Sequence, residues 1–199
     1  MASSPSQLAS LAHLAQDLVK KTVSSASRAA LIFQGVEPAV APRFATAGLV
    51  QPFVDNSVNV DTSAVITGNV FVGTNAVLGR QVVLKSGTHR VEVRHQAVIG
   101  DGAVLTAISS DVYSKETGLP TVCIVGTKAV IGPRSVLESC IVEDGAVIGD
   151  GSVIGEGAIV GKGAHVDAGT VVPKAKYVPA GEHWGGNPIK YFGPVSNDH

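Results

Sequence analysis

Aliphatic residues recur every six positions along most of this 199-residue chain. One run carries Val60, Ile66, Val72, Leu78 and Leu84, and a longer one carries Val142, Ile148, Ile154, Val160, Val166, Val172 and Val178. A β-strand alternates with period two and an α-helix with period 3.6, so neither alone gives a strict six. A six-residue side that ends in a corner does give it. The pattern therefore predicts a prism with one aliphatic side chain per side pointing inward.

Three phase breaks interrupt the period between these runs. A nine-residue step leads to Val93, Ile99 and Leu105; a twenty-residue step leads to Val125, Ile131 and Leu137; and a five-residue step leads to Val142. Three hexads close one coil, so the eighteen hexads predict about six coils. A glycine follows the aliphatic residue in most copies, and we expect it to supply the tight backbone of each corner.

The predicted fold class is all-β, a parallel β-helix of hexapeptide repeats over residues 53–182. Protein families with this repeat form left-handed β-helices, and we expect the same hand here. The segment around residues 107–123 lies at the longest phase break and is expected to protrude. Residues 35–52, with prolines and little periodicity, are expected to form a linker. Residues 183–199 leave the period and form a C-terminal tail.

The N-terminal extension, residues 1–34, has a helical pattern. Leu8, Leu11, Ala15, Leu18, Val19 and Thr22 follow the spacing of one helix face, and Gln16, Lys20, Lys21 and Ser24 lie on the other. The pattern predicts an amphipathic α-helix. A targeting remnant, a helix on a membrane surface, a helix docked on a partner and a helix covering its own prism all remain open. Candidate contacts to a partner or a membrane are Leu8, Leu11, Leu18, Lys20 and Lys21.

Charge and cysteine content narrow the choice of partners and chemistry. The formal net charge is −1, which gives no basic field for nucleic acid. The chain contains no run of 18 apolar residues, so no membrane span is predicted. The two cysteines, Cys123 and Cys140, make no disulfide framework. They lie about one coil apart, and we expect buried reduced thiols.

The stretch VPAGEHWGGNPIKYF, residues 178–192, resembles the close of the γ-class carbonic anhydrases. The matching signature residues are Trp184, Gly186, Asn187 and Pro188. The resemblance extends over residues 53–192, because the phase breaks coincide as well as the repeat. Hexapeptide acetyltransferases share a Gly-Asn-Pro ending, whereas the Gly-Glu-x-Trp part favours the γ class.

The resemblance implies a metal held by three histidines, two from one subunit and one from the next, with a position left open for water. At the matching positions this chain has Thr106, Pro133 and Glu138. Pro133 has no ligating atom, and one carboxylate is not a site. The resemblance therefore implies a chain with no catalytic residue, no metal and no cofactor, which by itself is not an enzyme.

Three supporting positions of the family are altered as well. Its Arg-Gly-Asp corresponds to Lys85-Ser86-Gly87, so the Arg–Asp pair between subunits is lost at Lys85 and Gly87. Its glutamine that positions solvent corresponds to Gly100. Of the remaining histidines, His89, His95 and His165 are interpreted as surface or corner residues rather than as a replacement metal site.

Subunits of this kind resemble components of mitochondrial respiratory complex I. The resemblance implies a structural role beside two related γ-carbonic-anhydrase-type subunits. Such a heterotrimer lies on the matrix side of the inner membrane and contacts membrane-arm subunits. The serine-rich, basic N-terminal extension fits this expectation. The alternatives are a free-standing hexapeptide-repeat acyltransferase, which needs a histidine poised near a groove between subunits, and a γ-class homologue that only binds a ligand.

Overall fold

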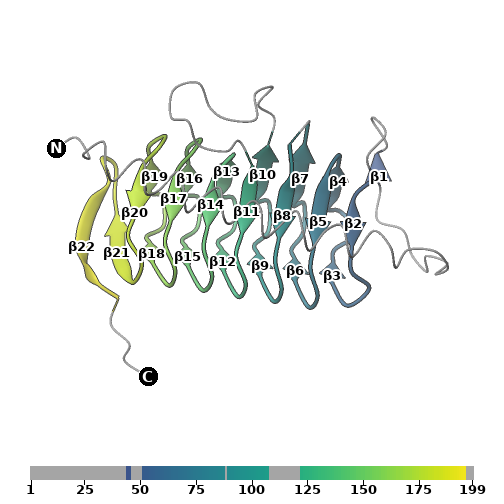
Figure 1. Cartoon of the computed structure of the whole chain (residues 1–199), viewed down its shortest axis with the longest axis horizontal. Coiled ribbons are helices and arrows are strands. Elements are labelled where there is room, and N and C mark those ends of the chain that lie inside the picture. The colour runs from purple at the N-terminus through teal and green to yellow at the C-terminus, as the bar shows by residue number, and fades with distance from the viewer. Residues whose placement is uncertain (1–43, 46–50, 88, 108–121, 196–199) are drawn as a thin grey trace.

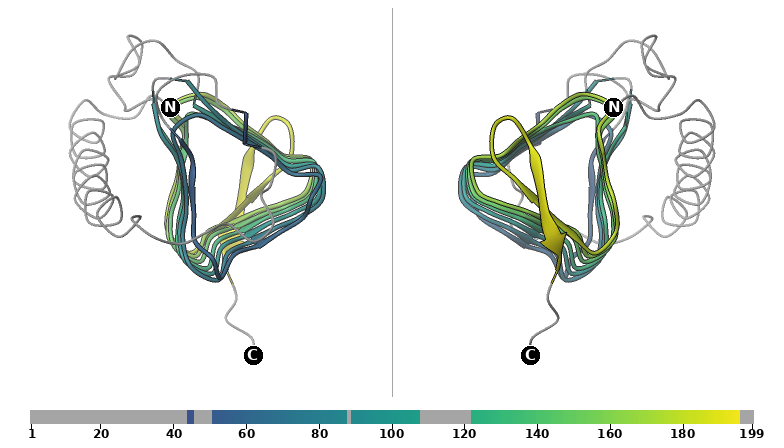
Figure 2. Two further views of the ribbon diagram at one scale, coloured as in Figure 1. Left: turned by 90° about the vertical axis from the view of Figure 1, so that its right-hand side faces the viewer. Right: turned by 90° about the vertical axis from the view of Figure 1, so that its left-hand side faces the viewer.

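The computed structural model describes residues 44–45, 51–87, 89–107 and 122–195. Within them the chain is all-β, a left-handed parallel β-helix of about six coils, which confirms the predicted fold class. Figure 1 shows the coils stacked along one long axis, and Figure 2 shows their triangular cross-section from either end. The predicted N-terminal helix and the segment at residues 108–121 lie outside the described residues. In the described part of the chain, no helix is long and apolar enough to cross a membrane.

Three flat sheets form the sides of the prism, and we call them A, B and C. Sheet A contains β1 (Phe44–Ala45), β4 (Val65–Thr67), β7 (Val83–Ser86), β10 (Val104–Ala107), β13 (Val136–Glu138), β16 (Val153–Ile154) and β19 (Val171–Val172). Sheet B contains β2 (Phe53–Val54), β5 (Val70–Val72), β8 (Val91–Val93), β11 (Cys123–Val125), β14 (Ile141–Val142), β17 (Ile159–Val160) and β20 (Tyr177–Val178). Sheet C contains β3 (Asn59–Val60), β6 (Val77–Leu78), β9 (Val98–Ile99), β12 (Val130–Ile131), β15 (Val147–Ile148), β18 (His165–Val166), β21 (Glu182–Gly185) and β22 (Lys190–Pro194).

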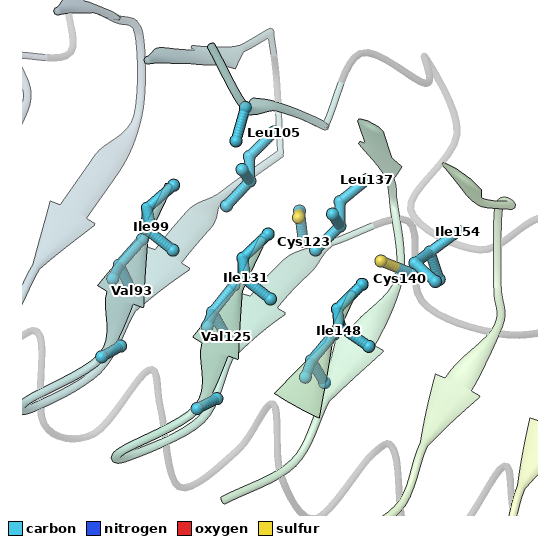
Figure 3. Close-up of a cluster of buried hydrophobic side chains, with 14 of the residues drawn as sticks. Val93, Ile99, Leu105, Cys123, Val125, Ile131, Leu137, Cys140, Ile148 and Ile154 are labelled. Carbon is cyan, nitrogen blue, oxygen red and sulfur yellow. The ribbon is translucent and has the colours of Figure 1, made fainter. Parts of the chain in front are cut away.

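The aliphatic residue of each hexad points inward and stacks on its equivalent in the next coil. Ile131, for example, lies in register with Ile99 on one side and Ile148 on the other. Figure 3 shows this column together with those of the other two sheets. These side chains are at most 1% exposed, so each fully buried one stabilises the fold by up to about 1.5–3 kcal/mol.

The two cysteines lie in this same core. Cys123 and Cys140 are buried and not bonded to each other as a disulfide, as the sequence predicts. A hydrogen bond with Cys123 and burial together raise the pKa of the Cys140 thiol well above its ordinary value.

The glycines after the aliphatic residues have a different role from the expected one. Ten described glycines have positive φ, but the eight that follow aliphatic anchors are not among them. At seven of the eight, all but Gly73, an added Cβ atom would lie less than 3.0 Å from an atom of the next coil. At Gly132 a Cβ atom would lie 2.6 Å from the backbone nitrogen of Asp150. Close stacking, and not a left-handed conformation, therefore selects glycine at these positions.

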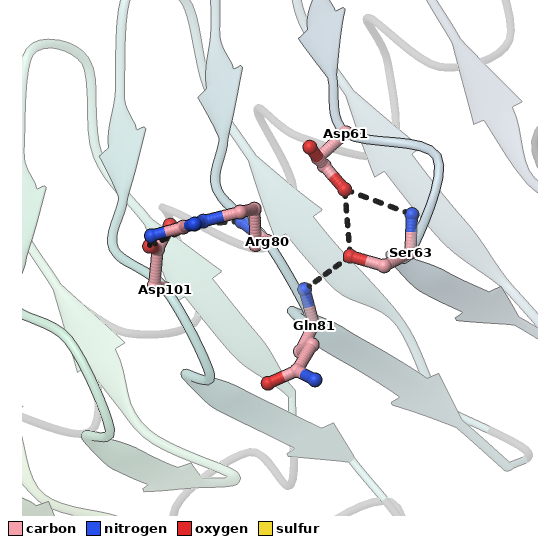
Figure 4. A network of polar contacts seen from close by, with 5 residues as sticks. All are labelled: Asp61, Ser63, Arg80, Gln81 and Asp101. Atoms are coloured by element: carbon pink, nitrogen blue, oxygen red, sulfur yellow. Dashed lines mark hydrogen bonds and ion pairs between the residues drawn. The ribbon is translucent and has the colours of Figure 1, made fainter.

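Side-chain hydrogen bonds and an ion pair connect the corners of neighbouring coils. Figure 4 shows Asp61 accepting hydrogen bonds from the backbone N–H and the hydroxyl of Ser63, both through Oδ1. The hydroxyl oxygen of Ser63 then accepts the backbone N–H of Gln81, at 2.8 Å, and so holds Gln81 at a φ of +56°. Beside it, Arg80 forms an ion pair with Asp101 of the following coil, with 2.7 Å between Nη2 and Oδ2.

The sheets extend beyond both predicted boundaries of the β-helix. Phe44–Ala45, in the segment expected to be a linker, forms β1 and pairs in parallel with β4. The expected boundary after Glu182 falls inside β21, which pairs in parallel with β18 and adds a further strand to sheet C. Strand β22 then turns back antiparallel to β21 and closes that sheet. Short edge strands do not need the aliphatic hexad, which is why the period marked neither of them.

Candidate functional site

The outward face of sheet C changes character at its C-terminal end. Val98, Val130 and Val147 point outward on successive coils, each more than a third exposed. The next two residues in the same row are His165 and His183, which are register partners on β18 and β21. Their rings stack with 4.9 Å between centroids. The stacking of coils thus places two imidazoles side by side from residues that are 18 positions apart.

Asp167 fixes the orientation of the second imidazole. Its Oδ1 lies 2.7 Å from Nε2 of His183, and both side chains are partly exposed, at 41% and 34% respectively. Asp167 directly follows β18, and its backbone N–H donates to the carbonyl of Trp184. Its own carbonyl accepts the buried hydroxyl of Ser152 at 2.9 Å. These two contacts fix the main chain of Asp167, from which its carboxylate projects.

Gly185 and Phe192 line the space around Asp167 and His183. A Cβ atom at Gly185 would lie 2.5 Å from Oδ2 of Asp167, so a side chain there would displace the carboxylate. Phe192 of β22 packs against the ring of His183, with 5.5 Å between centroids. Phe192 remains 58% exposed and forms an aromatic wall on one side of the site.

The arrangement of His183 and Asp167 is suited to general base chemistry. A neutral imidazole that donates Nε2–H to a carboxylate keeps a lone pair on Nδ1. The carboxylate fixes this tautomer and stabilises the imidazolium that forms when Nδ1 takes a proton. A hydroxyl or amine placed at Nδ1 would thereby be activated as a nucleophile.

Two of the three positions that the resemblance links to metal binding are neighbours. Thr106 and Glu138 are register partners at the ends of β10 and β13. The Thr106 hydroxyl donates to the carbonyl of Leu137 at 3.4 Å, and the Glu138 side chain is exposed. Pro133 lies at a different corner, between β12 and β13. Threonine, proline and a single glutamate do not fit a zinc site, so no step is assigned to a metal there.

Of the three supporting positions of that resemblance, packing explains Gly100. A Cβ atom at Gly100 would lie 2.5 Å from the nitrogen and 2.8 Å from Cδ of Pro133 on the next coil. Gly100 and Pro133 therefore form one packing unit. Lys85 is exposed and lies in register with Thr106, and Gly87 is exposed one residue beyond β7.

Among the described residues, His89 and His95 lie apart from this pair of histidines. His95 is exposed, and its Nδ1 lies 2.7 Å from the hydroxyl of Thr74. The carbonyl of His89 accepts the hydroxyl of Ser86. Among the residues that the structure describes, no group of three or more His, Cys, Asp or Glu side chains is arranged to hold a metal ion.

The C-terminal signature residues lie around the β21–β22 hairpin. Trp184 is half-buried against the core, donates Nε1–H to Glu182 at 2.8 Å and carries Lys176 over its ring at 4.5 Å. Gly186 donates its backbone N–H to the hydroxyl of Thr170. Asn187 and Pro188 are joined by a cis peptide bond in the turn. The N-terminal contact candidates, Leu8 to Lys21, lie outside the described residues.

No protein-family model and no curated protein sequence matches the chain. Solved structures do. A hexapeptide transferase family protein from Anaplasma phagocytophilum is 26% identical, with a TM-score of 0.68 over 78% of this chain and 84% of that one. A candidate acetyltransferase from Bacillus cereus is 24% identical, with a TM-score of 0.65 over 74% and 80% of the two chains. The chain is thus similar to hexapeptide-repeat proteins of the transferase kind.

This similarity corrects the expectation that the chain is not an enzyme. That expectation follows from the missing histidines of one family, yet a similar structure, 26% identical, is described as a hexapeptide transferase family protein. Among the similar structures reported above, none is described as a γ-class carbonic anhydrase or a complex I subunit.

The sequence pattern alone does not reveal the pair formed by Asp167 and His183. It predicts a surface or corner residue at His165 and places His183 in the C-terminal tail. The 18-residue spacing of His165 and His183, equal to three hexads, is the signal that places them on one face of adjacent coils.

Proposed function

We propose that this protein is an acyltransferase in which His183 acts as the general base. The main support is the 2.7 Å contact between His183 Nε2 and Asp167 Oδ1. This contact leaves Nδ1 of a partly exposed side chain to accept a proton. The similarity to a hexapeptide transferase family protein supports a transfer reaction on this fold. The proposal matches the alternative expectation of a free-standing hexapeptide-repeat acyltransferase, and it names His183 and Asp167 as the residues that act.

The proposed step moves an acyl group from a thioester to an amine or a hydroxyl. The nucleophile attacks the thioester carbonyl while Nδ1 of His183 takes its proton, and a bond from nitrogen or oxygen to carbon forms. The tetrahedral intermediate collapses with cleavage of the carbon–sulfur bond. The departing thiolate then receives the proton from the imidazolium, which restores neutral His183. Asp167 stays ionised throughout and stabilises the imidazolium.

The test uses the full chain with acetyl-CoA and a panel of amine and hydroxyl acceptors, with release of the CoA thiol as the readout. His183→Gln and Asp167→Asn are each expected to lower acceptor-dependent kcat by about 100-fold or more. His95→Gln is the matched control, because His95 is an exposed histidine far along the prism from this pair. Equal activity of His183→Gln and wild type, with the fold intact by circular dichroism, would contradict the proposal.

A second candidate is the assembly role that the γ-class resemblance implies. This role is supported by the placement of Thr106 and Glu138 at one corner of the prism and of Pro133 at another. This division fits positions that meet only across a subunit interface. The role would be that of a subunit in the matrix-side heterotrimer of mitochondrial complex I, with two related chains as partners. Native mass spectrometry on source membranes tests it, since a soluble homotrimer would argue against it.

A further inference from the structure

The imidazole of His183 has a neighbouring ring on each adjacent strand. In sheet C, β21 lies between β18 and β22 (Figure 1), and His183 on β21 is the register partner of His165 on β18. Their two rings are nearly parallel, with an angle of 23° between planes and 4.9 Å between centroids. From β22, the ring of Phe192 lies 5.5 Å from that of His183 and is tilted by 60°. The neighbouring strands therefore hold the imidazole between two rings.

A β-bulge determines which ring of β22 reaches His183. In the ladder between β21 and β22, His183 pairs with Gly193. The next pair is Trp184 with Tyr191, so Phe192 is an extra residue between two pairs. Bulges re-aim side chains and are over-represented beside active sites. Here Tyr191 packs on Trp184, with 5.6 Å between centroids, whereas Phe192 packs on His183.

Gly185 allows a carboxylate and an aromatic ring to approach the same place. A Cβ atom there would lie 2.5 Å from Oδ2 of Asp167 and 2.7 Å from Cε2 of Phe192. Asp167 reaches Nε2 of His183 through its other oxygen, at 2.7 Å. The χ2 torsion of a histidine has broad wells, so one hydrogen bond alone leaves the plane of the ring loosely defined. Contacts on both sides of the ring restrict that rotation.

We propose that His165 and Phe192 are positioning residues for the transfer reaction. They hold the plane of the His183 imidazole, so that the lone pair on its Nδ1 keeps one direction. This inference rests on the proposed function, in which His183 is the general base. A misplacement of about 1 Å in an active site can lower a rate by about 100-fold, so the order of this ring bears directly on the proton transfer. Neither positioning residue takes a proton from the substrate or forms a bond with it.

His165 acts in this proposal through the face of its ring and not through its nitrogens. His165→Phe keeps a flat ring beside His183 and removes both nitrogens, whereas His165→Ala removes the ring. The same comparison is available on the other side, where Phe192→Tyr keeps the ring and Phe192→Leu removes it. Each position therefore has one variant that keeps the flanking ring and one that abolishes it.

Steady-state kinetics of the full chain with acetyl-CoA test the positioning role. His165→Ala and Phe192→Leu are each expected to lower acceptor-dependent kcat about tenfold, with the KM for acetyl-CoA nearly unchanged. His165→Phe and Phe192→Tyr are expected to keep the wild-type kcat. Tyr191→Leu is the matched control, because Tyr191 is the adjacent aromatic residue and packs on Trp184 instead. A wild-type kcat in Phe192→Leu, or a loss of activity in His165→Phe, would overturn the proposal.

A measurement without substrate separates this proposal from the proposed function. In ¹³C relaxation experiments, the ring of His183 is expected to be ordered in the wild type and in Tyr191→Leu, and mobile in His165→Ala and Phe192→Leu. Loss of ring order in both variants would confirm that the two rings hold the imidazole, even if His183→Gln retained full activity and so contradicted the general base. Unchanged ring order in both variants, with activity that His183→Gln abolishes, would refute the positioning role and leave the general base in place.

Discussion

Gly132→Ala and Gly145→Ala form a pair of substitutions that separates close stacking from backbone conformation. Gly132 has no positive φ, but its added Cβ would lie 2.6 Å from the nitrogen of Asp150 and 2.7 Å from the carbonyl carbon of Gly149. Gly145 has a φ of +69°, and its Cβ would meet nothing within 4 Å. The first position resists a side chain because of the neighbouring coil, the second because of its own dihedral angle.

The structure sets the expected magnitudes. At Gly132 the contact is about 0.8 Å short of ordinary van der Waals distance, and backbone atoms of the next coil must move. Such overpacking costs about 1–3 kcal/mol. The movement also strains the 2.8 Å hydrogen bond from Gly132 N–H to the Ile148 carbonyl, worth about 1 kcal/mol. The total is about 2–4 kcal/mol. At Gly145 an alanine at positive φ costs about 1 kcal/mol, partly offset by lower entropy of the unfolded chain.

Equilibrium unfolding in guanidinium chloride measures the difference. Far-UV circular dichroism follows the whole solenoid, and fluorescence of Trp184, the single tryptophan, follows its C-terminal end. Two probes are needed because a solenoid can unfold in segments. Gly132→Ala should lose clearly more free energy of unfolding than Gly145→Ala. Equal losses, or a larger loss at Gly145, would refute the view that stacking selects these glycines.

Three further predictions concern polar and thiol groups. Ser152→Ala removes the hydrogen bond to the Asp167 carbonyl at a site with no exposure and should lower the free energy of unfolding by about 1 kcal/mol; no change in the denaturation midpoint would contradict it. Hydrogen bonds from Ser57 hold the pKa of Asp55 below its ordinary value of 3.8, so this carboxylate stabilises the fold above that pH and the contribution is lost as pH falls through the lowered pKa. Ser57→Ala should therefore raise the pKa of Asp55 in an NMR titration, and an unchanged titration would show that the hydroxyl is not its cause. Both thiols are buried, and the hydrogen bond with Cys123 together with burial raises the pKa of Cys140, so neither should react with a disulfide reagent at pH 8 until the protein unfolds; rapid reaction of the folded protein would contradict this.

The fold was predictable because the hexad is a strong and redundant signal. Each inward residue, such as Ile131 or Ile148, repeats the same information, and one irregular coil does not erase it. The role of glycine was harder to predict. A sequence shows that Gly132 follows an anchor, but only the stacked coils show that Asp150 fills the space where a side chain would go.

The candidate site could not be predicted in the same way, because it depends on residues brought together by stacking. Asp167 and His183 are 16 positions apart and follow no short motif. Their contact needs β21 to continue the β-helix, whereas the change of pattern after Glu182 predicts an exit from it. The resemblance at Trp184 directed attention to Thr106, Pro133 and Glu138, which do not form a site within one chain.

The most direct test of the central claim is acceptor-dependent release of CoA thiol from acetyl-CoA by the wild-type chain beside His183→Gln. The account predicts turnover by the wild type with at least one amine or hydroxyl acceptor, and a loss of about 100-fold or more in the variant. Turnover that is unaffected by His183→Gln, or wild-type protein that releases no thiol across the acceptor panel, would contradict it.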